Sequence, residues 1–156
     1  TLPAGSSAAL SKKPLLRVSV YDHDLTSDDE LLGVAEVRLE ADWEALGSAP
    51  IDFVYLKATE GRDWKDTRYQ ENWREAGQRG WHVGAYHFYL LCKNGAAQAE
   101  NFIQSVEVRD GTLPPAVDLE YAHNCTPDGP KAAVLAEIDD FLTALEAEYG
   151  SVYFSG

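Results

Sequence analysis

The sequence predicts an α/β fold in which a β-hairpin precedes parallel strands joined by helices. From Trp43 onward, apolar runs of strand length alternate with helical stripes, which is typical of a β/α barrel or a doubly wound sheet. Before Trp43, two runs alternate apolar and polar residues, the period of half-buried strands. Two strands alone are marginally stable, so the hairpin is expected to pack on the rest of the chain.

The hairpin is expected within residues 15–41. Its first strand covers 15–21, and its second alternating run covers 35–40. An acidic loop, DHDLTSDDELLG, separates these two runs. Residues 1–14 are rich in Ala, Ser, Gly and Pro and are expected to form a flexible leader.

The remaining elements are expected in residues 42–156. Tyr69, Trp73 and Ala76 follow one another at helical spacing, and Pro130 and Gly150 are typical start and stop residues of the last helix. The expected strands are 53–58, 81–89, 115–119 and one beginning at 152; the expected helices are 66–77, 96–106 and 130–149.

Composition excludes several classes of function. The chain has 156 residues, enough for one compact domain, and its formal net charge of −13 disfavours binding to nucleic acid. No apolar run approaches the length of a transmembrane helix, so no membrane span is expected. Residues 1–10 have neither the basic start nor the apolar length of a signal peptide, so none is expected in this chain.

Asp118 and Glu120 are the sharpest chemical signal in the sequence. Residues i and i+2 of a strand point to the same side, with Cα atoms about 6.6 Å apart. Two such carboxylates can share a cleft, one as a proton donor and one as an anion, which is what glycosidic bond cleavage needs. The alternative is a pair of exposed strand-end carboxylates that cap turns.

Other polar residues also follow the ends of expected strands. Glu60 ends the first strand of the parallel set, and His87 lies at the end of the second. Because parallel strands end at one rim, Glu60, His87 and the Asp118/Glu120 pair are expected there together.

The motifs around these residues resemble glycoside hydrolase family 25, the lysozymes or muramidases of peptidoglycan. The resemblance is carried by the blocks KATEG, GAYHF and PPAVDLE, in the family's order, and runs from Asp42 to Gly156. It implies cleavage of the β-1,4 bond between N-acetylmuramic acid and N-acetylglucosamine. It also implies bacterial peptidoglycan as the partner, no required cofactor, and a secreted or cell-wall-associated protein.

The resemblance also implies roles for individual residues. Glu120 matches the general acid, and Asp118 matches the carboxylate that orients or stabilises the substrate's N-acetyl group. The residues implied or expected to contact substrate are Glu60, Tyr86, His87, Tyr121 and Trp64.

The resemblance is partial, because no segment before Asp42 matches the family's first strand, which bears a further active-site Asp in a D-V-S-x-x-Q-G pattern. The family's later strands are not matched either. The implied fold is therefore a partial β/α (TIM-like) barrel with an N-terminal β-hairpin. Open strand edges favour self-association. The alternatives to an active enzyme are a non-catalytic fragment that binds cell-wall sugar and an inactive chimera assembled by self-association.

The hairpin resembles another family, the C-two domain that binds calcium and phospholipid, over LLRVSVYDHDLTSDDELLGVAEVRL. Asp22, Asp24 and Glu30 match its acidic loop positions and are candidate Ca²⁺ ligands, because Ca²⁺ prefers oxygen ligands. The alternative is a solvated acidic hairpin.

Cys92 and Cys125 each follow the end of a neighbouring expected strand. Their side chains could therefore meet at the rim and, in a secreted enzyme, form a disulfide; two free thiols are the alternative.

The acidic loop should bind calcium no more tightly than about millimolar, because it offers few of the six to eight oxygens that surround the ion in tight sites. Isothermal titration calorimetry of the chain and of the Asp22→Asn variant measures this. Micromolar binding that is lost in the variant would contradict the prediction.

Overall fold

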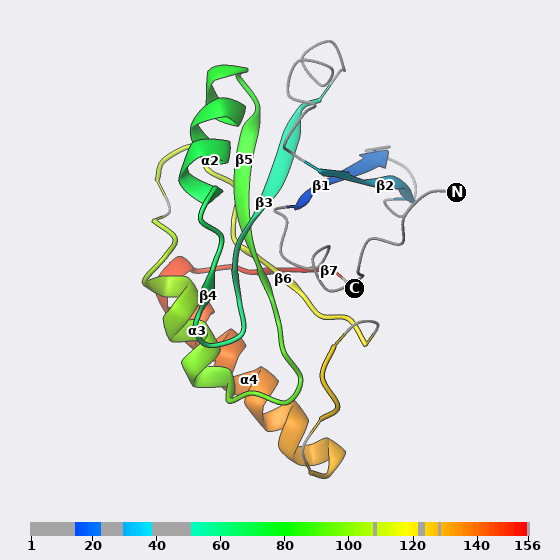
Figure 1. Cartoon of the computed structure of the whole chain (residues 1–156), viewed down its shortest axis with the longest axis vertical. Helices are drawn as coiled ribbons and strands as arrows, with labels where there is room; N and C mark the ends of the chain where they lie inside the picture. The colour runs from blue at the N-terminus through cyan, green and yellow to red at the C-terminus, as the bar shows by residue number, and fades with distance from the viewer. Residues whose placement is uncertain are drawn as a thin grey trace, which may run out of the picture.

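The computed structural model of the chain describes residues 15–22, 30–38, 51–107, 109–121, 124–127 and 129–155. Its strands form one mixed sheet in the order β2-β1-β3-β5-β6-β7, and β4 pairs with β3 (Figure 1). The strands are β1 (Leu15–Asp22), β2 (Glu30–Arg38), β3 (Phe53–Glu60), β4 (Trp64–Lys65), β5 (His82–Phe88), β6 (Ala116–Asp118) and β7 (Tyr153–Ser155). The helices are α2 (Tyr69–Gln78), α3 (Gly95–Ile103) and α4 (Lys131–Tyr149).

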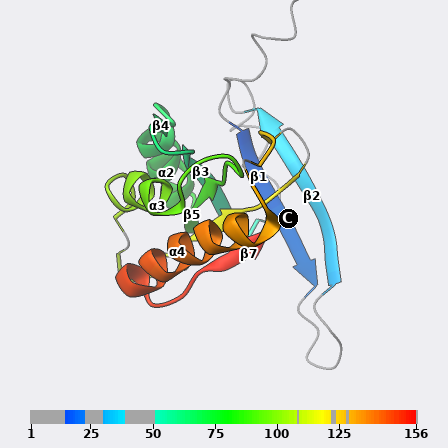
Figure 2. The ribbon, with the colours of Figure 1, turned by 90° about the horizontal axis from the view of Figure 1, so that it is seen from below.

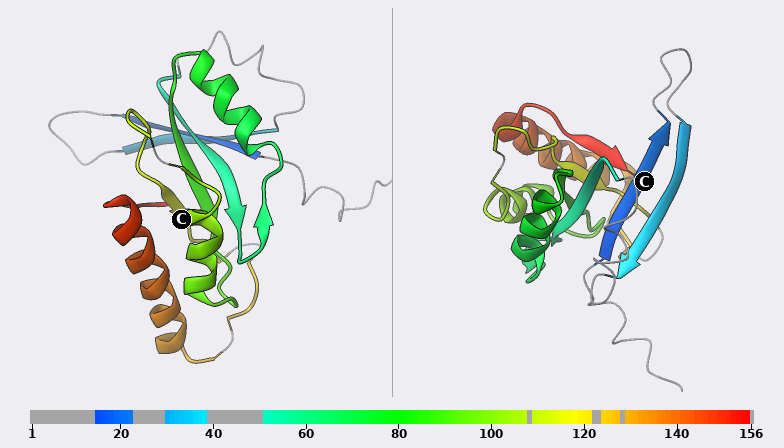
Figure 3. Two further views of the ribbon diagram at one scale, coloured as in Figure 1. Left: turned by 90° about the vertical axis from the view of Figure 1, so that its left-hand side faces the viewer. Right: turned by 90° about the horizontal axis from the view of Figure 1, so that it is seen from above.

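Four of these strands are parallel neighbours, as the sequence predicts. β5 pairs with β3, β6 with β5, and β7 with β6, all in parallel. One helix connects each pair, since parallel strands need a crossover between them. Figure 2 shows α2, α3 and α4 on one side of these strands and the β1–β2 hairpin on the other, and both views of Figure 3 agree.

The main core lies between the parallel strands and the helices. Alternate residues of β3, Val54, Leu56 and Ala58, are buried, as are Val83 and Ala85 of β5. Period-two alternation places each of these sets on one face of the sheet. The largest fully buried apolar side chains are Tyr89, Phe102, Phe141, Leu56 and Leu145.

The helices lie close to their predicted bounds, with two differences of three residues. The helix predicted to end at 106 ends at Ile103, and the other difference is at the start of α2. The sequence predicts a helix from Asp66, whereas α2 begins at Tyr69. The preceding residues Trp64–Lys65 pair with β3, and the Asp66 carboxylate accepts a hydrogen bond from the Arg68 backbone N–H at 2.8 Å. This short turn delays the helix. Gly150 ends α4 with a φ of 83°, as predicted.

The hairpin covers the free edge of β3. β1 and β2 pair in antiparallel fashion, and β1 also pairs with β3, at Leu16 with Leu56 and at Arg17 with Tyr55. β2 begins at Glu30, earlier than the predicted alternating run, so the connection between the two strands is shorter than expected. Of the four parallel strands that the structure describes, β7 is the one with a partner on one side only.

A matched pair of glycine substitutions tests the packing of α3 on α4. A Cβ at Gly95 would overlap the backbone carbonyl of Glu137, whereas a Cβ at Gly77, inside α2, would meet nothing within 4 Å. Gly95→Ala should therefore destabilise the fold by about 1–3 kcal/mol. Gly77→Ala should stabilise it by roughly 0.5–1 kcal/mol. Urea denaturation of both variants measures the difference, and equal midpoints would contradict the close approach of α3 to α4.

Candidate active site

The site lies on the sheet face that points away from the helices. We call it the carboxylate face and define it by Lys57, Glu60, Tyr86, Phe88 and Asp118. The strand register places Tyr86 opposite Lys57, and Phe88 between Glu60 and Asp118. Neighbouring strands are about 4.8 Å apart, so the Cα atoms of Glu60 and Asp118 lie roughly 10 Å apart across β5.

A register shift in β3 brings Glu60 to this face. The pairing of β3 with β5 shifts between Lys57 and Thr59, so that Thr59 lies opposite His87 and Glu60 opposite Phe88. In a regular strand Lys57 and Thr59 would share a face. A bulge of this kind re-aims side chains and is frequent beside active sites.

Lys57 and Glu60 form an ion pair in which Lys57 Nζ lies 2.6 Å from Glu60 Oε2. The same ammonium lies 4.9 Å from the ring centroid of Trp64 and 5.0 Å from that of Phe88. The electron-rich face of an aromatic ring attracts such a cation. Lys57 is not among the site residues expected from the sequence, although its alternation with Phe53 and Tyr55 already indicates the face on which it lies.

Toward the amino ends of the strands, the carboxylate face is filled by side chains. A Cβ at Gly84 would overlap the ring of Tyr55, so the glycine leaves room for that ring against β5. The Tyr55 hydroxyl donates a hydrogen bond to the Pro114 carbonyl at 2.9 Å. The chemistry-bearing side chains therefore gather at the carboxyl ends of the strands.

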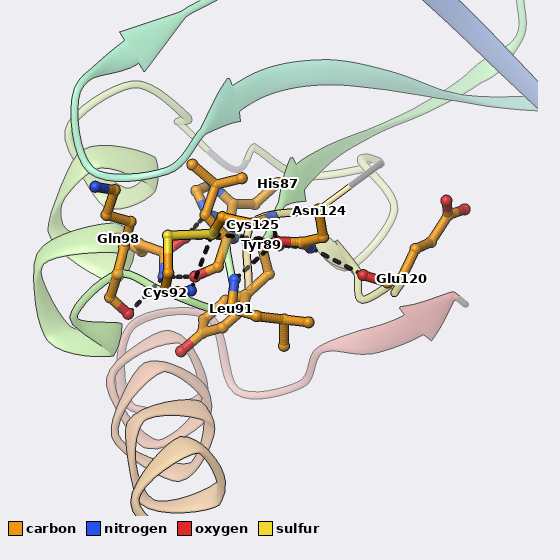
Figure 4. The surroundings of a disulfide bond; sticks show 10 residues. His87, Tyr89, Leu91, Cys92, Gln98, Glu120, Asn124 and Cys125 are labelled. Atoms are coloured by element: carbon orange, nitrogen blue, oxygen red, sulfur yellow. Dashed lines mark hydrogen bonds between the residues drawn. A yellow bond between two sulfur atoms is a disulfide. The ribbon is translucent and has the colours of Figure 1, made fainter. Parts of the chain in front are cut away.

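Asp118 and Glu120 stand at the end of β6, as the sequence predicts. Asp118 is the last residue of that strand and is buried, while Glu120 follows two residues later and is half-buried. Figure 4 shows the Glu120 side chain pointing away from the disulfide behind it. Tyr121, the next residue, is 83% exposed, Trp64 is half-buried, and Tyr86 is buried.

His87 does not lie on this face, which corrects the expectation that it lines the cleft. Its side chain is fully buried on the helix side, where its ring packs against Phe102 and Phe141. Its Nδ1 lies 2.7 Å from the Thr59 hydroxyl, and its Nε2 lies 3.3 Å from Gln98 Oε1. Because the Gln98 oxygen can only accept, these partners assign the proton to Nε2 of a neutral imidazole.

The two cysteines form a disulfide, with their Cα atoms 5.7 Å apart. The sequence leaves open a disulfide or two free thiols, and the structure has the disulfide. The bridge joins the segment that follows β5 to the segment that follows β6 (Figure 4). Asn124, beside this bridge, is not among the residues expected from the sequence, because an asparagine in a loop has no pattern that distinguishes it.

The candidate calcium ligands fall largely outside what the structure describes. The backbone register places Asp22 opposite Glu30, while Asp24 and the side chains of all three lie outside the described residues. Among the residues whose positions are described, no group of three His, Cys, Asp or Glu side chains could hold a metal ion. In the same part of the chain, no helix has both the length and the apolar character needed to cross a membrane.

Comparison with known proteins relates this geometry to one family. The family model described as "Glycosyl hydrolases family 25" matches residues 34–155. Lysozyme M1 from Streptomyces globisporus is 36% identical over 100 residues, which are 62% of this chain and 34% of that protein.

Two solved structures have the same arrangement of elements. A family 25 glycosyl hydrolase from Bacillus anthracis matches with a TM-score of 0.64 and 35% identity, over 72% of this chain and 53% of its own. A muramidase from Acremonium alcalophilum matches with a TM-score of 0.61 and 32% identity, over 72% of this chain and 58% of its own. The match implies that the parallel strands form part of a TIM-like barrel. The chain spans little more than half of each structure and about a third of lysozyme M1.

Burial lowers the pKa of His87 from its ordinary value of 6.5 to about 4, although the hydrogen bond that His87 donates to Gln98 opposes the shift. Between these values the unfolded chain binds a proton that the folded chain does not. The free energy of unfolding should therefore fall as pH drops from 6.5 to 4, by on the order of 2–3 kcal/mol from this residue.

Urea denaturation between pH 4 and pH 7 measures this effect in wild type and His87→Gln. The stability difference between them should narrow as the pH falls. His82→Gln, at an exposed position in β5, is the control for loss of a histidine. A difference that stays constant with pH would contradict a buried neutral His87.

Proposed function

The chain belongs to glycosyl hydrolases family 25, and from this premise we propose that it is a peptidoglycan hydrolase of the lysozyme type. Its reaction would be that of an N-acetylmuramidase, which cleaves the β-1,4 bond between N-acetylmuramic acid and N-acetylglucosamine. The observation that carries the proposal is the position of Asp118 at the carboxyl end of β6, on the face that Lys57 and Glu60 share, with Glu120 two residues beyond it.

Glu120 is the proposed general acid. It is half-buried and lies beyond the last ladder residue of β6, where its side chain can approach a bound sugar. Its carboxyl group donates a proton to the leaving glycosidic oxygen as the bond from that oxygen to the anomeric carbon breaks. A water molecule then adds its hydroxyl to the anomeric carbon, and its remaining proton returns to a carboxylate.

Asp118 is the proposed anionic partner. Positive charge develops at the anomeric carbon as the leaving group departs. A buried carboxylate is effective there, because its interaction with a nearby cation is stronger where water is excluded. In the proposed reaction Asp118 also orients the substrate's N-acetyl group, whose carbonyl oxygen bonds to the anomeric carbon as the leaving group departs. The incoming water then displaces that oxygen, and the N-acetyl group is restored.

The surrounding residues are proposed to hold the glycan. Lys57 keeps the Glu60 carboxylate in one orientation, 2.6 Å from its ammonium, so that Glu60 can accept hydrogen bonds from sugar hydroxyls. Trp64, Tyr86 and Tyr121 offer aromatic surface at the same end of the sheet. The substrate is bacterial peptidoglycan, the protein acts outside the cell at the cell wall, and no cofactor takes part.

A second candidate is a module that binds cell-wall sugar without cleaving it. The exposed rings favour this candidate, because Tyr121 is 83% exposed and Tyr153 is 57% exposed. Exposed aromatic rings are suitable surfaces for pyranose rings. An inactive assembly of self-associated chains is a third candidate, which a light-scattering measurement of mass distinguishes from a monomer.

Glu120→Gln should reduce lysis of a bacterial cell-wall suspension by at least about 100-fold, because it removes the proton donor while keeping the side chain's shape. The loss of turbidity measures lysis, and circular dichroism checks the fold. Glu107→Gln, which removes an exposed carboxylate paired with Arg109, is the matched control and should lyse like wild type.

Two results would contradict the proposal. Wild-type lysis retained in Glu120→Gln would place the general acid elsewhere. A wild-type chain that sediments with insoluble peptidoglycan but does not clear the suspension would be a binding module instead of an enzyme.

A further inference from the structure

The carboxamide of Asn124 uses its full hydrogen-bonding capacity on the backbone. Its Nδ2 donates to the Tyr89 carbonyl at 2.7 Å and to the Glu120 carbonyl at 2.9 Å. Its Oδ1 accepts from the Leu91 N–H at 2.9 Å and from the Cys125 N–H at 2.8 Å. A carboxamide has two N–H donors and two acceptor lone pairs, so all four are engaged.

These bonds join two segments that no strand ladder joins at this level. Tyr89 and Leu91 belong to the segment after β5, whereas Glu120 and Cys125 belong to the segment after β6. The last ladder-like contact is the hydrogen bond from the Tyr89 N–H to the Asp118 carbonyl, at 3.0 Å. Beyond this bond, the hydrogen bonds of the Asn124 carboxamide connect the two segments in place of ladder bonds.

We infer that Asn124 is a positioning residue for Glu120, an inference that rests on the proposed function. Glu120 lies past the end of β6, where backbone without ladder bonds is ordinarily mobile. Asn124 holds the Glu120 carbonyl, and the Glu120 side chain leaves in the opposite direction (Figure 4). A general acid works only within hydrogen-bond reach of the leaving oxygen, so a small displacement is costly.

The disulfide does not replace this contact. It anchors the segment at Cys125, next to Asn124 in the chain, whereas Asn124 contacts Glu120 directly. Asn124→Asp is the sharpest variant, because aspartate has the same size and shape but no donors. Its carboxylate oxygen would face the carbonyl oxygens of Tyr89 and Glu120, and both bonds would be lost.

The experiment measures Asn124→Asp against wild type and a charge control. Thr126→Asp adds the same charge two residues away, at an exposed position that does not touch the carboxamide. Backbone ¹⁵N relaxation reports the order parameter of the Glu120 amide, and kcat and KM are measured on solubilised cell wall. Asn124→Ser, which lacks the donor amide but is small enough to fit, is the second variant should the aspartate variant fail to fold.

In a folded Asn124 variant, the Glu120 order parameter should fall below roughly 0.6, the range of flexible backbone. The kcat should fall at least about tenfold while KM stays within about threefold, because the substrate contacts remain and only the acid is misplaced. Thr126→Asp should match wild type in both. An unchanged order parameter and kcat, or loss of folding in both Asn124 variants, would overturn the inference.

The proposed function and this inference are tested by different measurements. A wild-type chain without lytic activity would refute the function. The relaxation measurement would then decide alone whether Asn124 fixes the backbone of Glu120.

Discussion

Buried backbone at the carboxyl ends of the parallel strands must find hydrogen-bond partners where the sheet ladder stops. Two carboxamides meet this constraint around the segment after β5. Gln98 donates to the carbonyls of Leu90 and Lys93 and accepts from the Leu90 N–H at 2.8 Å, while Asn124 serves the neighbouring segment from the other side. These hydrogen bonds hold the irregular segments that follow β5 and β6. The position of Glu120, which lies in the second segment, depends on them.

Buried polar side chains also need hydrogen-bond partners, and this need explains the contacts of His87. Its imidazole links Thr59 on β3 to Gln98 on α3, inside an aromatic cluster with Phe102 and Phe141. A neutral ring has one donor and one acceptor, and both have a partner here. His87 therefore joins sheet and helix layer, and the carboxylate chemistry lies on the opposite face of the sheet.

A partial barrel has to cover its open strand edge and to balance the charges of its carboxylate face, and different parts of the chain do this. An unpaired strand edge invites association with another chain, and β1 pairs with β3 at Leu16 and Arg17. The carboxylate face needs charges that do not repel one another. Lys57 offsets Glu60 there, while Asp118 stands two strands away. The chain matches only part of a family 25 protein, and Lys57, Glu60 and Asp118 lie within the matched residues.

The sequence by itself determined the alternation of strands and helices, the stop of α4 at Gly150 and the place of Asp118 and Glu120 at a strand end. These features follow from local periodicity and turn chemistry, which neighbouring residues carry. Only the tertiary structure decided the face of His87, the pairing of Cys92 with Cys125, the contacts of Asn124 and the edge that the hairpin covers. The register shift in β3 reverses which residues share a face, and the Asn124 contacts join segments far apart in the chain. Such pairings depend on which strands become neighbours, and local sequence patterns do not contain that information.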